Sequence, residues 1–308
     1  MAERTSLALG AAVVCGALVA VQARINGELA QDLHDALLAA VVSFGSGLVV
    51  IAVVVLASSA ARAGWHRLGA VPWWCRLGGL GGATLVASAA YAAPRIGVAL
   101  LTVAMVAGQT TGGLLIDKVG LGPSGRHALT PARVAGAVLC LAAVVLSVSG
   151  RGAGSGHVEL LLMMVAAGLL IATQQALNGR VRRETGHAGV ATLVNFIVGT
   201  AALVVAYTAF SNHRADRWPG PGEWWLYLGG TIGVAFIAVA AVTVRTLGVL
   251  RLGLATVAGQ LVGAVALDAV VPTAGHGVTL PTVLGAALTF VAVGLSGRGR
   301  RAPAAVPA

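Results

Sequence analysis

Ten long apolar runs, separated by short polar segments, restrict what this chain can fold into. Of its 308 residues, 57% are hydrophobic and only 10% are charged, and the mean hydropathy is +0.90. Water-soluble domains carry about 25% charged residues, so a soluble globular fold is excluded. Because a spanning helix needs roughly 20 apolar residues, the sequence predicts an all-α polytopic membrane protein with ten transmembrane helices. The predicted spans are 6–25, 36–57, 76–93, 97–116, 132–149, 158–177, 188–210, 224–244, 252–271 and 281–296.

The distribution of basic residues predicts the orientation of these spans. The chain carries 20 Lys and Arg residues against 10 Asp and Glu, a net charge of +10. Basic residues accumulate in cytoplasmic loops of membrane proteins, and most of them fall on the cytoplasmic side when the N-terminus is placed inside. We therefore expect a multi-pass protein of the inner (plasma) membrane with both termini cytoplasmic, and we read the positive charge as orientation, not as a nucleic-acid surface.

An internal repeat runs through the whole sequence. Residues 22–27 (QARING) recur as 174–179 (QQALNG), 42–44 (VSF) as 194–196 (VNF), and 108–109 (GQ) as 259–260 (GQ). The offset stays at 151 or 152 residues throughout. One register kept over four predicted helices indicates a duplication.

The repeat predicts the domain organisation and suggests a function. We expect a first five-helix repeat over 1–150, a linker at 151–157, a second five-helix repeat over 158–296 and a disordered cytoplasmic tail at 297–308. An odd number of spans inserts the second copy in the opposite sense, and such inverted repeats are typical of secondary transporters. The sequence thus predicts a secondary active transporter working by alternating access. The alternative is a non-transporting membrane scaffold or an accessory subunit of an envelope complex.

One helix of each half carries a family resemblance. Residues 98–117 are an apolar run with Gly108-Gln109, Gly112 and a final Asp117, and residues 253–268 repeat this pattern. The pattern resembles the fourth helix of the YdcZ-type inner-membrane exporters, a group within the drug/metabolite transporter (DMT) superfamily. The Gln-x-x-x-Asn ending of the first helix in each half is similar too.

The resemblance implies a fused, two-copy member with ten helices, of DMT/EamA-like fold. It also implies export of a small organic metabolite or drug across the inner membrane. One departure concerns the first helix, where the small multidrug-resistance relatives carry an acidic residue. Neither 7–21 nor 160–173 contains one, so proton/drug exchange through that carboxylate is not expected.

Polar side chains inside a bilayer usually mark a pathway or join neighbouring helices. Two amide pairs at i and i+4 share a helix face in each half; they either form access groups for a polar substrate or cap helix ends at Asn-Gly turns. Amides near mid-depth are substrate contacts or interhelical bonds, and Tyr91 forms a cavity wall or lies at the membrane interface. The candidate substrate-binding residues are Gln22, Asn26, Ser43, Tyr91, Gln109, Gln174, Asn178, Asn195 and Gln260.

Two acidic residues near span ends are candidates for ion coupling. Asp117 precedes Lys118, which favours a solvated pair, whereas Asp268 has no adjacent base and is the better candidate. No catalytic motif or metal-ligand spacing is visible, so we expect neither an enzyme nor a cofactor, and the three cysteines are expected to be packing residues. The expected partners are a small-molecule substrate and the lipid bilayer, with no nucleic acid, for a monomer or homodimer.

Overall fold

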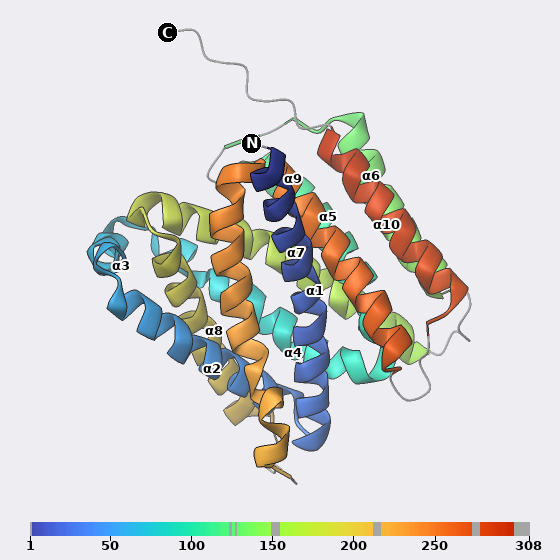
Figure 1. Ribbon diagram of the computed structural model, residues 1–308, viewed down its shortest axis with the longest axis horizontal. Helices are drawn as coiled ribbons and strands as arrows, with labels where there is room; N and C mark the ends of the chain where they lie inside the picture. Colours follow the sequence, from blue (N-terminus) through green and yellow to red (C-terminus); the bar gives the residue numbers. More distant parts are fainter. Residues whose placement is uncertain are drawn as a thin grey trace, which may run out of the picture.

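The structure is a computed structural model that describes residues 2–122, 125–126, 128–148, 155–211, 217–272 and 278–298. Every regular element in these ranges is helical, and the helices form one bundle (Figure 1). The α-helices are α1 (Ala2–Asp32), α2 (Ala36–Ala57), α3 (Ser59–Trp65), α4 (Gly79–Ile96), α5 (Val98–Val119), α6 (Pro131–Val148), α7 (Ser155–Thr185), α8 (Ala188–Phe210), α9 (Gly229–Val270) and α10 (Leu280–Arg298). Three 3₁₀ helices join them: η1 (His66–Ala70), η2 (Trp73–Gly78) and η3 (Pro221–Leu228).

The helices have the length and composition of membrane-spanning segments. Within the described ranges, six are long and apolar enough to cross a bilayer, and two shorter apolar helices accompany them. Large apolar side chains also point outward, such as Val145 (73% exposed), Val205 (66%) and Leu56 (66%). An apolar exterior of this kind is stable against lipid and not against water, so the chain is a membrane protein.

The first helix of each half is longer than its sequence suggested. α1 continues to Asp32 and α7 to Thr185, so Asn26 and Asn178 lie inside helices. The interpretation that these asparagines cap helix ends is therefore wrong. α7 also begins at Ser155, inside the predicted linker 151–157; residues 151–154 of that linker, and 299–308 of the predicted tail, lie outside the described residues.

The two predicted spans 224–244 and 252–271 form one continuous helical element, α9, preceded by η3. Both of its arms pack on α1, in the pairs Gly229 with Asn26, Gly233 with Gln22, Gly259 with Val13, and Gly263 with Ala17. Along the first arm of α9, the contacted residues of α1 lie progressively closer to the N-terminus of α1. Along the second arm they lie progressively closer to its C-terminus. α9 therefore reverses its direction between Gly233 and Gly259, as its path in Figure 1 shows.

The first half makes the same reversal with a break in the helix. α4 ends at Ile96 and α5 begins at Val98, and the residue between them, Gly97, has φ +79°. That conformation is strained for any residue with a Cβ. Pro94 is tolerated in the last turn of α4, so this helix ends three residues after the predicted span 76–93.

The two halves pack crosswise, each helix mainly against the other half. α1 packs on α9 and α7 on α5, while α2 pairs with α8 and α6 with α10. The closest backbone approaches are reciprocal: Gly108 meets Val165, Gly168 meets Met105 and Gly79 meets Asn195, while Gly259 meets Val13, Gly16 meets Thr256 and Gly230 meets Ser43. Each contact is its counterpart shifted by the repeat offset. Both halves therefore make the same backbone contacts.

Equivalent residues of the two halves also meet in the contact between α2 and α8. Phe44 and Phe196, equivalent in the repeat, meet there with ring centroids 5.1 Å apart. Gly199 and Gly47 lie beneath the rings of Phe44 and Phe196, respectively, where a Cβ would come within 2.3 Å of a ring carbon. The equivalent N-terminal ends of α2 and α8 are also both capped, by Asp35 and His187.

Candidate functional site

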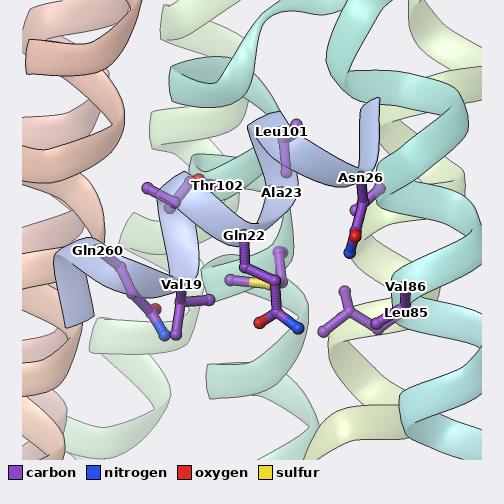
Figure 2. Close-up of a pocket in the computed structure, with 12 residues that line it drawn as sticks. Val19, Gln22, Ala23, Asn26, Leu85, Val86, Leu101, Thr102 and Gln260 are labelled. Atoms are coloured by element: carbon purple, nitrogen blue, oxygen red, sulfur yellow. The ribbon is translucent and has the colours of Figure 1, made fainter. Parts of the chain in front are cut away.

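A small cavity lies between α1, α4, α5 and the second arm of α9. Its volume is about 40 Å³, far below the roughly 300–1,000 Å³ of sites that hold drug-sized ligands. Figure 2 shows the polar side chains of Gln22, Asn26, Thr102 and Gln260 around it. The remaining lining residues are apolar: Val19, Ala20, Ala23, Leu85, Val86, Ala89, Leu101 and Met105.

Three of the predicted site residues meet at this cavity. Gln22 and Asn26 reach it from α1, where they stand one turn apart, and Gln260 reaches it from α9. Asn26 is 1% exposed and Gln260 7%, and the amide oxygens Asn26 Oδ1 and Gln260 Oε1 have no hydrogen-bond partner among the described residues. Since a buried polar atom without a partner costs about 1–3 kcal/mol, these two oxygens are the feature of the site that most needs a physical explanation.

The sequence difference between Ser43 and Asn195 explains why one of these oxygens, Asn26 Oδ1, has no partner. In the second half, Asn178 Nδ2 donates a 3.1 Å hydrogen bond to Asn195 Oδ1. In the first half the equivalent residues are Asn26 and Ser43, and both Asn26 Oδ1 and Ser43 Oγ are buried without a partner. A serine is too short to bridge the gap that an asparagine spans. The asparagine of the first helix is therefore hydrogen-bonded to the second helix in the second half. In the first half, this hydrogen bond is missing.

The second amide group is separate from the cavity. Gln174 packs against Gly82, where a Cβ would lie 2.7 Å from Gln174 Oε1, and Asn178 packs against Gly78. Gln174 Oε1 is also buried without a partner among the described residues. The amides of the first half have the same surroundings. Gly233 lies beside Gln22 as Gly82 lies beside Gln174, and Gly229 lies beside Asn26 as Gly78 lies beside Asn178.

Two other candidates lie apart from these groups. Tyr91 is 44% exposed and stacks under the guanidinium of Arg95, 3.7 Å from its ring centroid, and it does not line the cavity. Gln109 lies on α5 where that helix crosses Gly168 of α7. Thr102 and Met105, which do line the cavity, were not predicted, because a single threonine or methionine in an apolar helix carries no signal in the sequence.

Asp268 is buried (2% exposed) and joins the two halves. Its Oδ1 accepts a 3.1 Å hydrogen bond from the backbone N–H of Val98, and its Oδ2 a 2.7 Å bond from that of Ala99. Both N–H groups belong to the first turn of α5, where a helix has free donors and a positive dipole end. The two donors, Val98 and Ala99, precede the cavity-lining residues Leu101 and Thr102 by three positions in α5.

Asp117, the equivalent residue in the first half, has a different environment. It forms a salt bridge with Arg133 of α6, so the interpretation of Asp117 as a solvated partner of Lys118 does not describe its main contact. Its charge is neutralised within the protein. Among the described residues, no group of three or more His, Cys, Asp or Glu side chains is arranged to hold a metal ion.

A protein-family model with the description "Putative inner membrane exporter, YdcZ" matches residues 7–146 and, separately, residues 160–295. This chain belongs to the YdcZ family. The double match confirms that it is the two-repeat form of a YdcZ protein, and it assigns the chain to a family of inner-membrane exporters within the DMT group.

One solved structure, titled "Crystal structure of protein", resembles this YdcZ chain over nearly its full length. The TM-score is 0.59 at 21% sequence identity, and the likeness covers 95% of this chain and 96% of the other. That similarity supports the fold alone. None of the curated proteins compared with this chain matches it.

Proposed function

We propose that this YdcZ-family protein is a secondary active transporter that exports a small organic metabolite or drug by alternating access. The observation that carries the proposal is the reciprocal packing of two homologous halves beside a small cavity lined by three amide side chains. Two equivalent halves can exchange roles, so that a site open to one face of the membrane becomes open to the other.

In this proposal ten helical segments span the membrane as two inverted five-helix repeats. They are α1, α2, α4, α5 and α6 in the first half, and α7, α8, the two arms of α9, and α10 in the second. The start of α1 and the end of α10 lie at the same end of the bundle (Figure 1), which supports an even number of crossings. Together with the basic residues of the predicted cytoplasmic segments, this favours both termini in the cytoplasm.

The small cavity is the proposed position of the substrate site in this cycle. Substrate access requires α1 to move against α9 or α4. In the α1–α9 contact, the backbones approach closely at Gly16, Gly259 and Gly263. Small residues at a helix interface let the two backbones approach closely.

Asp268 is the residue we propose to couple transport to an ion. It is buried, and its carboxylate holds the first turn of α5, the helix that supplies Leu101, Thr102 and Met105 to the cavity. A change in the charge of Asp268 would weaken those two hydrogen bonds and act directly on a wall of the site. Asp117 is less suited to this role, because Arg133 neutralises it.

Flux in proteoliposomes tests the function. Purified protein is expected to give saturable flux of at least one compound in a panel of metabolites and drugs. Gln22→Ala, Asn178→Ala and Gln260→Ala should impair it in protein that still folds. Gln31→Ala, an exposed position on α1, is the matched control. Stable co-purification with one partner and no flux for any compound would favour the scaffold alternative.

The same preparation tests coupling and topology. Asp268→Asn should abolish flux driven by an ion gradient while leaving substrate exchange at equilibrium. Reporter fusions at the two ends of the chain should both report the cytoplasm. Reporters on opposite sides would overturn the inverted arrangement, because two five-span halves in one chain return its end to the starting side.

A further inference from the structure

The chain between α2 and α4, residues 58–78, forms a helical connection at the periphery of the bundle, where Figure 1 shows α3. Its three parts, α3, η1 and η2, are each far shorter than the roughly 20 residues of a spanning helix. The inner side of the connection packs on the end of α7. Val71 shares a buried apolar cluster with Val181, and a Cβ at Gly64 would lie 2.9 Å from the carbonyl oxygen of Thr185.

The outer side of this connection combines exposed tryptophans with exposed arginines. Trp65 is 39% exposed and Trp73 is 71% exposed, and Arg62 and Arg67 are also exposed. Tryptophan accumulates where the apolar core of a membrane meets its polar head groups, and interfacial helices combine it with Lys and Arg. This composition places the outer side of the connection at the level of the lipid head groups.

The positive charge of the connection is not neutralised by carboxylates. Residues 58–78 contain Arg62, Arg67 and Arg76 and no Asp or Glu. Arg76 Nη2 donates to two backbone carbonyl oxygens, at 2.7 and 2.9 Å, and Arg62 donates to another. A carbonyl oxygen satisfies an N–H donor without cancelling the charge. Within the part of the chain that the structure describes, none of these three arginines forms a salt bridge.

The adjoining end of α7 adds positive charge to the same surface. Arg180 lies over the ring of Trp74, 5.2 Å from its centroid, and Arg182 is exposed in the last turns of α7. A Cβ at Gly186, directly after α7, would lie 3.7 Å from Arg67 Nη1, so the connection and the end of α7 are neighbours. We call the following five residues the basic face: Arg62, Arg67, Arg76, Arg180 and Arg182.

The equivalent connection in the second half has exposed tryptophan without the excess charge. Residues 211–228 contain two arginines and two acidic residues, and Trp224 is 62% exposed. Arg217 pairs with Glu223 at 2.6 Å and with Asp32 at 3.4 Å. Because η3 packs on α1 with its charges paired, packing of such a connection does not require unpaired arginines.

One pair of equivalent positions differs in the same sense. Arg180 of α7 corresponds to Glu28 of α1 at the repeat offset of 152 residues, and Glu28 pairs with Arg24 at 2.6 Å. The connection on α1 is therefore surrounded by paired charges, whereas the connection on α7 belongs to a surface with an excess of arginine.

We infer that the basic face binds the phosphate groups of anionic lipids in the adjacent membrane leaflet. A guanidinium carries five N–H donors and matches the geometry of phosphate oxygens, and the exposed tryptophans hold the connection at the depth of the head groups. A basic residue close to an anionic membrane surface strengthens binding by about fivefold. The inference goes beyond the proposed transport function and does not depend on it.

Hydrogen exchange of the full chain in nanodiscs tests the inference. One preparation contains phosphatidylcholine alone, and the other an equimolar mixture of phosphatidylcholine and phosphatidylglycerol. Peptides from 59–78 should exchange at least about fivefold more slowly in the mixture, whereas peptides from 217–228 should exchange equally in both. The difference should shrink at 1 M salt, where the Debye length falls to about 3 Å.

Two double variants assign the effect to the basic face. Arg62→Gln with Arg67→Gln removes two exposed charges from it and should reduce the slowing to less than about twofold. Arg95→Gln with Arg217→Gln removes the same charge from two exposed arginines elsewhere and should leave the slowing at 59–78 unchanged. Equal thermal midpoints in phosphatidylcholine nanodiscs should show that both variants fold like the natural protein.

Equal exchange of 59–78 in the two lipid preparations would overturn the inference, and so would full slowing in the variant that lacks Arg62 and Arg67. Glycerol 3-phosphate added to phosphatidylcholine nanodiscs should not slow exchange. Slowing by this soluble compound would overturn the assignment to lipid and indicate a site for a soluble phosphate. Flux is measured separately, so none of these results decides the transport proposal.

Discussion

The carboxylate of Asp268, at the end of α9, accepts a 2.7 Å hydrogen bond from the backbone N–H of Ala99, in the first turn of α5. The two residues are 169 positions apart and belong to different halves. Together with the bond to Val98, this contact ties the end of one half to the start of a helix in the other.

Asp268→Asn is expected to destabilise the fold by about 1–3 kcal/mol, because the new Nδ2 group faces a backbone donor and one N–H loses its acceptor. Thermal unfolding in detergent measures the loss, and hydrogen exchange of the Val98 and Ala99 amides should accelerate with it. Glu159→Gln, an exposed carboxylate on α7, should leave both quantities unchanged. An unaltered melting point for Asp268→Asn would contradict the assignment of these hydrogen bonds.

Gly108→Ala and Gly259→Ala should be destabilising to a similar degree. A Cβ at Gly108 would lie 2.0 Å from the Val165 carbonyl oxygen, and one at Gly259 would lie 1.9 Å from that of Val13. Forcing such helices apart costs about 1–3 kcal/mol, which outweighs the gain of about 1 kcal/mol in helix propensity. The change is measured as the shift in thermal midpoint.

The matched controls are Gly113→Ala in α5 and Gly253→Ala in α9, where a Cβ would meet nothing within 4 Å. Both should be neutral or slightly stabilising. Unequal effects of Gly108→Ala and Gly259→Ala, with one of them neutral, would contradict the reciprocal packing of the two halves.

Phe44 and Phe196 should show a coupling free energy in a double-mutant cycle with leucine. Ring centroids 5.1 Å apart correspond to an aromatic pair worth about 0.5–1.5 kcal/mol beyond its buried area. The cycle is followed by thermal or denaturant unfolding. A second cycle between Phe44 and Phe210, which is 82% exposed on α8, should give no coupling.

The segment before η3 should loosen at low pH. A hydrogen bond from Arg217, 2.6 Å from Glu223 Oε2, lowers the pKa of Glu223 below its ordinary value of 4.5, and the backbone N–H of Gly220 acts in the same direction. A lowered carboxyl pKa contributes stability above the ordinary value, and that contribution is lost as the pH falls through the lowered pKa.

Hydrogen exchange at Gly220, corrected for the intrinsic effect of pH, measures this change. Protection should decrease as the pH drops below 4.5 in the natural protein. Glu223→Gln should be less protected at neutral pH and show no such transition. Because the pair is exposed to solvent, the effect is expected to stay local and to leave the melting point of the bundle unchanged.

The sequence was sufficient for the helical class, the duplication and the residues of one amide cluster. Polar side chains in an apolar chain are few, so Gln22, Asn26 and Gln260 were identifiable as candidates before their contacts were known. Their meeting was not predictable, since Gln260 reaches α1 only through the crosswise packing of the halves, which no local pattern encodes.

Other features depend on long-range packing for the same reason. Asp268 was identified as a buried acid, but its partner at Ala99 lies in the other half. The continuation of α1 past Asn26 was missed because Asn-Gly favours a turn in isolation. Here packing overrides that preference: Gly27 contacts Ala93 and Pro94, and Asn26 contacts Gly229. The ten crossings and the roles of the remaining candidates stay predictions.

The crosswise pairing of α1 with α9 and of α7 with α5 has a consequence for how such a chain arises. A lone copy of either repeat would expose the surfaces on which its first and fourth helices meet their counterparts, and it could cover them only with a second molecule. An ancestor encoding one repeat would thus have been an obligate dimer. Joining two copies in tandem fixes the stoichiometry at one to one and frees each copy to diverge, as Ser43 and Asn195 have done.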